Sequence, residues 1–381
     1  MSIASALGFS SGKKVRYAIV GAGDIAQEAM MPGVSHTGNS EMTAIVTGDI
    51  VKAHALGERY GIEHRYGYDD FARMLADGVA DAIYLATPNW RHAEFAIPAL
   101  QAGLHVLSEK PLEITSEKAQ SIVDAAAASS ARLMVAYRLH FEPATLDAIR
   151  RIRAGELGEV MAFTSAFAQM VDPANHRANS GDLAGPLLDM APYPINATRY
   201  LFEAEPTEVV SAVATRHAAA GFGADVDDTI AVTLRFPGDR IAQFTCSYYA
   251  NAINSFVVAG TKGSITMDPG YTFGKSLEQY RVIGGKRSHE SFKATDQFGG
   301  EMAYFSDCIL NGRDPEPDGE EGLADLRVIE GIERALASGR AEVLPPFHRS
   351  RRIDPDAQER TLRVVSPPEP VNASDPSRNQ G

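Results

Sequence analysis

Val15-Arg-Tyr-Ala-Ile-Val-Gly-Ala-Gly-Asp-Ile-Ala26 joins a short β-rich run to a glycine-rich loop and the start of a helical stretch. The loop, Gly21 to Ala26, has the G-x-G-x-x-A form, in which the first glycine makes a tight turn and the second lets a pyrophosphate approach the backbone. Alone the pattern is weak, but its position between a strand and a helix makes it strong. The free N–H groups at the helix start then favour an anionic diphosphate.

The next predicted strand, residues 41–46, indicates which dinucleotide is preferred. It ends at Thr47-Gly48-Asp49, with Lys52 close behind. Sites for NAD commonly carry an acidic residue at this strand end, where it binds the ribose 2′-hydroxyl. Because Thr47 stands there, no carboxylate at that position repels a 2′-phosphate, and Lys52 offers a balancing charge. The sequence therefore favours NADP, unless Asp49 turns inward and reverses the preference.

Strand and helix patterns alternate from residue 15 to about 137, which predicts a doubly wound parallel sheet, a Rossmann domain. Such sheets bind ligands at the carboxyl ends of their strands. Two further loops leave predicted strands at this edge: Thr87-Pro-Asn-Trp-Arg-His92 and Glu109-Lys110-Pro111. The Lys110–Pro111 bond is a candidate cis peptide, since cis bonds are found almost only before proline.

The pattern changes after residue 137, where short β-rich runs follow one another. They lie at residues 160–169, 208–215, 229–236, 241–249, 255–260 and 264–267, with late helices predicted at 299–310 and 322–338. This succession favours an open, mainly antiparallel sheet. We therefore expect an α/β chain with an N-terminal arm (1–14), an NADP-binding Rossmann domain (15–137), an α+β substrate and oligomerisation domain (138–348) and a tail (349–381). The tail is rich in Pro, Ser, Arg and Asp, and is predicted to be either disordered or an extended strap.

Composition excludes several classes of protein. The 381 residues are 44% hydrophobic and 22% charged, with a net charge of −13, which argues against binding to nucleic acid. No apolar stretch approaches membrane-spanning length, and residues 1–14 lack the apolar core of a secretory signal. Cys246 and Cys308 have no metal-binding spacing. We expect a cytoplasmic protein with reduced thiols and no metal.

Several motifs together resemble the Gfo/Idh/MocA oxidoreductases. They are Gly21–Ala26, Ala86-Thr-Pro-Asn89, Ala102-Gly-Leu-His-Val-Leu-Ser-Glu-Lys-Pro111, Gly185-Pro-Leu-Leu-Asp-Met-Ala-Pro-Tyr193 and Asp296-Gln-Phe298, in the order typical of that family. The resemblance implies that Lys110 contacts the substrate and the nicotinamide ribose. It also implies that the motif ending at Tyr193 supplies the proton-transfer group. Lys110, Asp189 and Tyr193 are therefore the predicted catalytic residues.

Tyrosine at position 193, with Thr47-Gly48 and Lys52, is similar to the glucose–fructose and aldose oxidoreductase branch of the family. That branch implies oxidation of a cyclic aldose at its anomeric carbon to the lactone. It also implies a homodimer or a dimer of dimers, and an N-terminal arm that helps to retain NADP while a second sugar regenerates it. Pro192 and Pro194 depart from the usual pattern. Three alternatives stay open: a ketosugar reductase, an inositol or trans-dihydrodiol dehydrogenase, and a non-catalytic nucleotide-binding regulator, although the three catalytic residues count against the last.

The chemistry of alcohol oxidation makes this trio reasonable. Tyrosine is a weak base at its reference pKa of about 10, and a nearby ammonium such as Lys110 favours the phenolate. Asp189 and Tyr193 stand four residues apart, so on a helical turn both face one cleft. Asp189 then holds a sugar hydroxyl or orients Lys110. Tyr248, Tyr249 and Phe298 are assigned to packing.

The remaining candidates are assigned by their position in the predicted loops. The predicted cofactor-binding residues are Gly21, Ala22, Gly23, Asp24, Ile25, Thr47, Gly48, Lys52, Tyr68, Thr87, Pro88, Asn89, His92, Glu109, Lys110 and Arg138. The predicted substrate-binding residues are Lys110, Arg138, His176, Arg177, Asp189 and Tyr193, with His140 as a weaker candidate.

Overall fold

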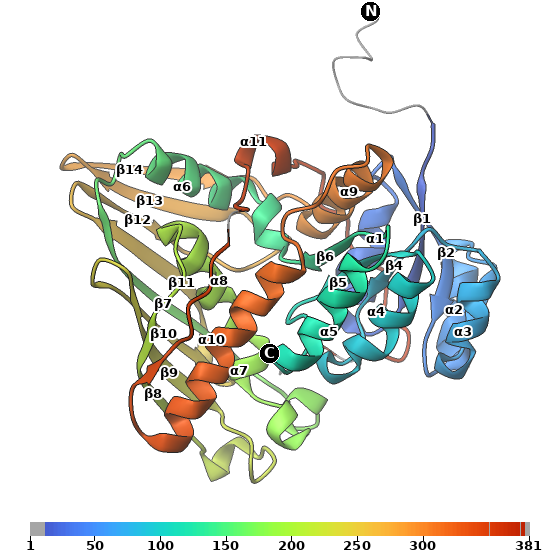
Figure 1. Ribbon diagram of the computed structural model, residues 1–381, viewed down its shortest axis with the longest axis horizontal. Helices are drawn as coiled ribbons and strands as arrows, with labels where there is room; N and C mark the ends of the chain where they lie inside the picture. The colour runs from blue at the N-terminus through green and yellow to red at the C-terminus, as the bar shows by residue number, and fades with distance from the viewer. Residues whose placement is uncertain (1–11, 350, 374, 378–381) are drawn as a thin grey trace, which may run out of the picture.

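The computed structural model describes residues 12–349, 351–373 and 375–377. Two sheets stand side by side, and the chain crosses from the first to the second after residue 137 and returns late (Figure 1). Residues 1–11 of the predicted N-terminal arm lie outside the described residues.

The first sheet is parallel throughout, with the strand order β3-β2-β1-β4-β5-β6. This is the doubly wound order 3-2-1-4-5-6, and its crevice opens between β1 and β4. The predicted Rossmann fold is confirmed. The strands are β1 (Val15–Val20), β2 (Ser40–Val46), β3 (His64–Tyr66), β4 (Ala82–Leu85), β5 (His105–Glu109) and β6 (Leu133–Ala136). The helices among them are α1 (Met31–Val34), α2 (Ile50–Tyr60), α3 (Phe71–Ala76), α4 (His92–Gln101) and α5 (Ser116–Ala127).

The first sheet has helices on both faces, and one of them comes from the far end of the sequence. Helix α9 (Gln297–Leu310) packs against β1, β2 and β5. Its residues Phe298, Met302 and Phe305 share a buried cluster with Tyr17 and Ile19. Because both faces are covered, the strands are apolar at successive positions rather than at alternate ones.

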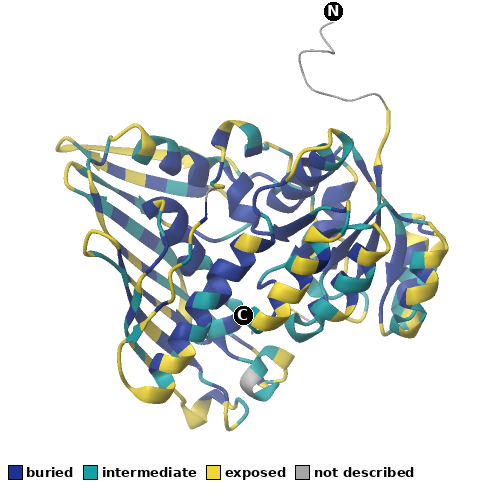
Figure 2. Cartoon of the chain, in the orientation of Figure 1, coloured by how far each residue is buried: buried dark blue, intermediate teal, exposed yellow. Residues whose placement is uncertain are grey.

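The second sheet has the order β14-β13-β12-β11-β7-β10-β9-β8-β15. All pairs are antiparallel except β7 with β10, so the predicted open, mainly antiparallel sheet is confirmed. Buried and exposed residues alternate along its strands (Figure 2). The strands are β7 (Val160–Met170), β8 (Glu208–Thr215), β9 (Thr229–Phe236), β10 (Arg240–Ser247), β11 (Tyr249–Gly260), β12 (Gly263–Met267), β13 (Leu277–Ile283), β14 (Lys286–Phe292) and β15 (Glu342–Val343).

Helices cover one face of this sheet, with α6 against β13, α8 against β7 and α10 against β8. Helix α10 also contacts α5 and β6, so it joins the two sheets. These helices are α6 (Pro143–Arg153), α7 (Pro186–Asp189), α8 (Pro192–Phe202) and α10 (Gly319–Ser338), followed in the tail by α11 (Pro355–Gln358).

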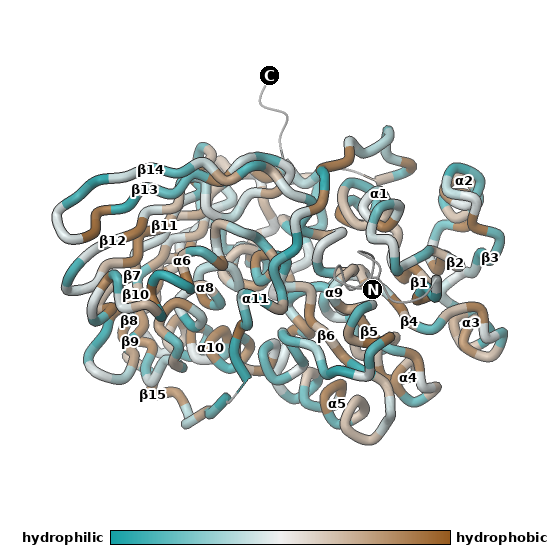
Figure 3. The backbone as a smooth tube through the Cα atoms, turned by 90° about the horizontal axis from the view of Figure 1, so that it is seen from above, coloured by the Kyte–Doolittle hydropathy of each residue, from teal (hydrophilic) through white to brown (hydrophobic). Residues whose placement is uncertain are grey.

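Two features of the second sheet differ from the prediction. The run at 241–249 is divided at Tyr248 into β10 and the longer β11, and the run at 255–260 is the end of β11. The hairpin of β13 and β14 was missed. Its outer strand is exposed at nearly every position and strongly hydrophilic (Figure 3), so it lacks the apolar alternation by which strands are recognised.

A buried ionic cluster connects α8, α10 and the start of the tail. The Arg199 guanidinium binds Glu205, Glu321 and Asp325 at 2.6–2.7 Å. Arg349 binds Glu321 as well. Because a buried charge without its partner is strongly destabilising, this cluster fixes α8 and anchors the tail. The start of the tail, at Arg349, is therefore held against the second domain.

Within the part of the chain that the structure describes, no helix combines the length and apolar character needed to cross a bilayer.

Candidate active site

A cavity of about 610 Å³ lies at the carboxyl edge of the first sheet and is closed on its other side by the second domain. Its volume is in the range of ordinary small-molecule sites. It brings together most of the predicted site residues. They are Gly21, Ala22, Gly23, Asp24, Ile25, Thr47, Lys52, Tyr68, Thr87, Pro88, Asn89, Glu109, Lys110, Arg138, His176, Arg177, Asp189 and Tyr193.

The two loop glycines have different surroundings. Gly21 has φ +91°, and a Cβ there would lie 2.6 Å from the Ala86 carbonyl carbon. At Gly23 a Cβ would meet no atom within 4 Å, because the space beside it belongs to the cavity. Gly21 therefore holds the turn against β4, whereas Gly23 leaves the backbone open to a ligand. This is the arrangement that a dinucleotide loop requires, so the residues present fit such a cofactor.

At the end of β2, the Asp49 carboxylate caps α2. Its Oδ1 accepts hydrogen bonds from the amides of Val51 and Lys52, each at 3.0 Å, and these bonds lower its pKa. Its Oδ2 accepts from Asn372 at 2.9 Å. Both oxygens are thus engaged, while Thr47 and Lys52 line the cavity.

Two predicted contacts lie away from the cavity. His92 is fully buried beneath it, and its ring nitrogens lie 3.1 Å from the carbonyl oxygens of Thr87 and Pro111. Burial lowers the pKa of His92 to about 4, so the ring is neutral at pH 7. His92 therefore connects two loops and does not bind the cofactor. Gly48 packs below the Tyr68 ring, where a Cβ would lie 3.1 Å from the ring.

His140, the weaker substrate candidate, is also buried away from the cavity, with its Nε2 2.7 Å from the Asn196 side chain. Its other ring nitrogen lies 3.2 Å from Glu316. Glu109 does line the cavity, and its carboxyl accepts a 2.6 Å hydrogen bond from the Tyr84 hydroxyl. Burial raises the pKa of Glu109.

The Asp189 side chain is the centre of the site. Its Oδ2 accepts a 2.7 Å hydrogen bond from the Tyr248 hydroxyl and lies 3.5 Å from Arg177 Nε. Its Oδ1 lies 3.5 Å from Lys110 Nζ, which also donates to the Asp189 main-chain oxygen at 2.9 Å. Burial opposes the charge, but Arg177 and Lys110 outweigh it and lower the pKa of Asp189 to about 2.

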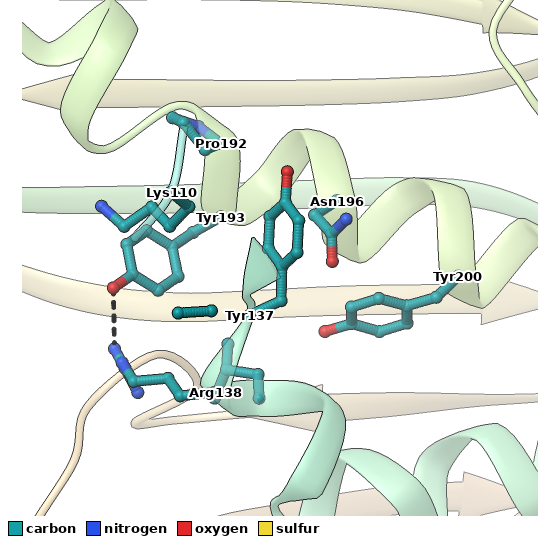
Figure 4. Close-up of a pocket in the computed structure, with 9 residues that line it drawn as sticks. Lys110, Tyr137, Arg138, Pro192, Tyr193, Asn196 and Tyr200 are labelled. Atoms are coloured by element: carbon teal, nitrogen blue, oxygen red, sulfur yellow. Dashed lines mark hydrogen bonds between the residues drawn. The ribbon is translucent and has the colours of Figure 1, made fainter. Parts of the chain in front are cut away.

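The Tyr193 hydroxyl points toward Arg138 (Figure 4). Arg138 Nη2 donates to that hydroxyl at 3.2 Å, whereas Lys110 Nζ lies over the ring, 4.7 Å from its centroid. Arg138 is held by the Gln297 side chain and the Tyr271 main-chain oxygen. The cation that touches the phenol oxygen is therefore Arg138, and Lys110 faces the ring and Asp189.

These contacts give the site a definite chemical capacity. A phenol oxygen lies in a cavity with one guanidinium hydrogen-bonded to it and a second cation over its ring. Cations so close can stabilise negative charge that develops during a reaction and can polarise a substrate oxygen. The arrangement suits proton transfer to or from a hydroxyl group beside a dinucleotide loop.

Tyr248 and Gln297 bind two charged residues of the site, Asp189 and Arg138, and the sequence reasoning missed both contacts. Tyr248 was assigned to packing because a buried aromatic residue in a strand gives no other signal. Gln297 lies between Asp296 and Phe298 of a recognised motif, and that position was its only signal.

Comparison with protein families identifies the class of both domains. Residues 15–137 match the model of the oxidoreductase family with an NAD-binding Rossmann fold, and residues 145–266 match the GFO/IDH/MocA C-terminal domain. The chain therefore belongs to the Gfo/Idh/MocA family of oxidoreductases, as its motifs indicated.

Individual relatives point to sugar chemistry. The chain is 31% identical to a D-xylose 1-dehydrogenase [NADP(+)] of Haloarcula marismortui, over 84% of this chain and 91% of the relative. It is similar to the crystal structure of an aldose-aldose oxidoreductase from Caulobacter crescentus complexed with glycerol, with a TM-score of 0.82, 34% identity, and coverage of 87% and 100%. A 3-ketoreductase from Actinomadura kijaniata, in complex with NADP and TDP-benzene, has a TM-score of 0.76, 26% identity, and coverage of 86% and 98%.

The two glycines of the loop provide a matched test. We expect Gly21→Ala to lower the free energy of unfolding by about 1–3 kcal/mol, since it combines a left-handed conformation with a steric clash. Gly23→Ala should fold normally, within about 0.5 kcal/mol, yet weaken dinucleotide binding at least about tenfold by filling the cradle. Thermal unfolding and fluorescence titration measure the two effects. A Gly23→Ala protein that binds dinucleotide as tightly as the wild type contradicts this account of the loop.

Proposed function

We propose that the chain is an NADP-dependent sugar oxidoreductase that oxidises a cyclic aldose at its anomeric carbon to the lactone. The observation that carries the proposal is the Tyr193 hydroxyl, bound by Arg138 and set within the cavity that also contains the dinucleotide loop. The aldose substrates named for two of the relatives support the choice of sugar.

In the mechanism, Tyr193 accepts the proton of the anomeric hydroxyl. Arg138 stabilises the negative charge that develops on the phenol oxygen, and Lys110 binds the substrate oxygen. Asp189 holds Lys110 and Arg177 in place through its carboxylate. The glycine loop, Thr47 and Lys52 would hold NADP, whose oxidised nicotinamide would supply the hydride acceptor for this reaction.

The selectivity for NADP follows from the end of β2. Thr47 and Lys52 line the cavity there, while the Asp49 carboxylate is occupied by the helix cap and Asn372. Lys52 therefore meets a 2′-phosphate without a competing free carboxylate.

We further propose that the chain retains its cofactor through two half-reactions. One sugar is oxidised to its lactone, and a second carbonyl sugar is reduced. The name of the aldose-aldose oxidoreductase relative supports this cycle.

A panel of sugars and polyols, assayed in both redox directions with identification of the product, tests the substrate class. Products other than a lactone from an aldose would favour ketosugar reduction or dihydrodiol oxidation.

The catalytic assignment predicts the effect of one hydroxyl group. Tyr193→Phe should lower turnover of the aldose by about 10²–10⁴-fold, because proton transfer by a positioned group is worth that much. NADP binding should be unchanged. Steady-state kinetics and a binding titration measure both quantities. The control is Tyr60→Phe at the end of α2, outside the cavity, which should be silent. Wild-type turnover of Tyr193→Phe rules out its role as the base.

Cofactor choice gives a second test. Lys52→Ala should weaken NADP by tenfold or more while NAD changes little, because a charge-assisted phosphate contact contributes about 1.5–3 kcal/mol. Titration with each cofactor measures the difference. Lys118→Ala on exposed α5 is the control. Equal weakening of both cofactors would show that Lys52 does not bind the phosphate.

We also propose a homodimer, or a dimer of such dimers, formed through the uncovered face of the second sheet. Large apolar side chains stand exposed on its strands, including Val213, Ile253, Tyr280 and Val282. Burying such a face is favourable. Light scattering should give at least twice the 40.9 kDa chain mass at micromolar concentration. A particle with the mass of one chain contradicts the proposal.

A further inference from the structure

A short segment near the C-terminus crosses the mouth of the cavity; we call residues 369–373 and 375–377 the strap. Its first part is bound to the Rossmann domain. Arg59 of α2 donates to the Glu369 main-chain oxygen at 2.6 Å. The Gln27 side chain, just past the glycine loop, bonds both the amide and the carbonyl of Val371, at 2.7 and 3.0 Å.

The second part of the strap is bound to the other domain. The Asp172 amide donates to the Pro376 oxygen at 2.9 Å, and Ser377 forms an antiparallel bridge with Val171. Val171 and Asp172, the partners of the strap in this domain, lie directly after β7. The strap therefore spans the opening between the two domains and is bonded on each side.

Between these attachments the strap forms part of the cavity wall. Asn372, Ala373, Asp375, Pro376 and Ser377 line the same cavity as Gly23 and Lys52. Asn372 binds Asp49, so it lies at the adenosine end of a dinucleotide. Asp375 and Asp24, which belongs to the glycine loop at the diphosphate end, line the same cavity. Burial, and after it the charge of Asp375, raises the pKa of Asp24.

We propose that the strap is part of the dinucleotide site: it covers the adenosine and diphosphate end of NADP and has to open before the cofactor can leave. The proposal rests on the NADP-binding function proposed above. It assigns cofactor retention to the C-terminal segment, whereas the resemblance had assigned it to residues 1–14, most of which lie outside the described residues.

The charges beneath the strap explain how it can open. Asp375 lies among the carboxylates of Asp24 and Glu28, and burial together with these like charges raises the pKa values of both Asp24 and Glu28. Hydrogen bonds at the two ends of the strap thus hold it closed against repulsion at its middle.

Truncation tests the proposal directly. A chain that ends at Pro368 loses the strap but keeps Arg349 and α11. NADP dissociation from the purified protein, followed by fluorescence after dilution into excess unlabelled competitor, should be at least tenfold faster than in the wild type. Gln27→Ala, which removes the bonds to Val371, should also speed release. A truncated chain with the wild-type melting temperature and the wild-type release rate overturns the proposal.

A second variant should act in the opposite direction. Asp375→Asn removes the like charge but keeps the acceptor for the Ser377 amide, which lies 2.7 Å away. Release of NADP should then be several-fold slower. Faster NADP release from Asp375→Asn would contradict this role of the strap. So would a result in which only the deletion of residues 2–11 speeds NADP release.

Amide hydrogen exchange gives a readout that does not depend on turnover. NADP should slow exchange at Val371, and truncation should speed exchange at Asp172, whose amide loses its acceptor. Exchange at Val371 that is equal with and without NADP overturns the proposal. If the wild type binds NADP but turns over no sugar, the proposed reaction fails, while the release rates still decide the role of the strap.

Discussion

The contact between Lys110 and Asp189 is the interaction on which the site depends, because it joins the two domains. Lys110 follows β5 of the first sheet, whereas Asp189 ends α7 of the second domain. Two further donors, Arg177 and Tyr248, converge on the same carboxylate. Its pKa of about 2 keeps it ionised from mildly acidic pH upward. The anchor therefore persists across the working pH range, and a pH dependence near neutrality must come from other groups.

The contact with Asp189 gives the two cations near Tyr193 different positions. Lys110 is drawn toward Asp189 and lies over the face of the ring, so Arg138 alone of the two reaches the hydroxyl. An arginine stays charged at any physiological pH. Arg138 is also pinned by Gln297 and by a main-chain oxygen, which restricts its guanidinium to one direction. A fixed charge stabilises a developing charge better than a mobile one, since no reorganisation is needed.

The features that could be predicted from the sequence are those that leave a pattern in neighbouring residues. The parallel sheet and its loops were recognisable because buried strands and a glycine loop leave contiguous signals, and Lys110 and Tyr193 were found through short motifs. The roles of Tyr248 and His92 were misjudged because they depend on partners distant in sequence. Tyr248 bonds Asp189, and His92 lies against the Pro111 carbonyl. The hairpin of β13 and β14 was missed since its exposed strand has no apolar period. The direction of a side chain also depends on tertiary contacts. These contacts decide that Arg138, and not Lys110, reaches the Tyr193 hydroxyl.

A chain with a net charge of −13 can still build a site for an anionic cofactor. Charges in solvent are screened beyond a Debye length of about 8 Å at physiological ionic strength, so the surface contributes little inside the cavity. The cations that line it, Lys52, Lys110, Arg138 and Arg177, act at close range, and the helix start beside the glycine loop adds its N–H groups. The carboxylate of Asp375 works against them, and it is carried by the strap. Among the described acidic residues that line the cavity, Asp375 is the one on the strap, so under the proposal above it is the charge that favours opening.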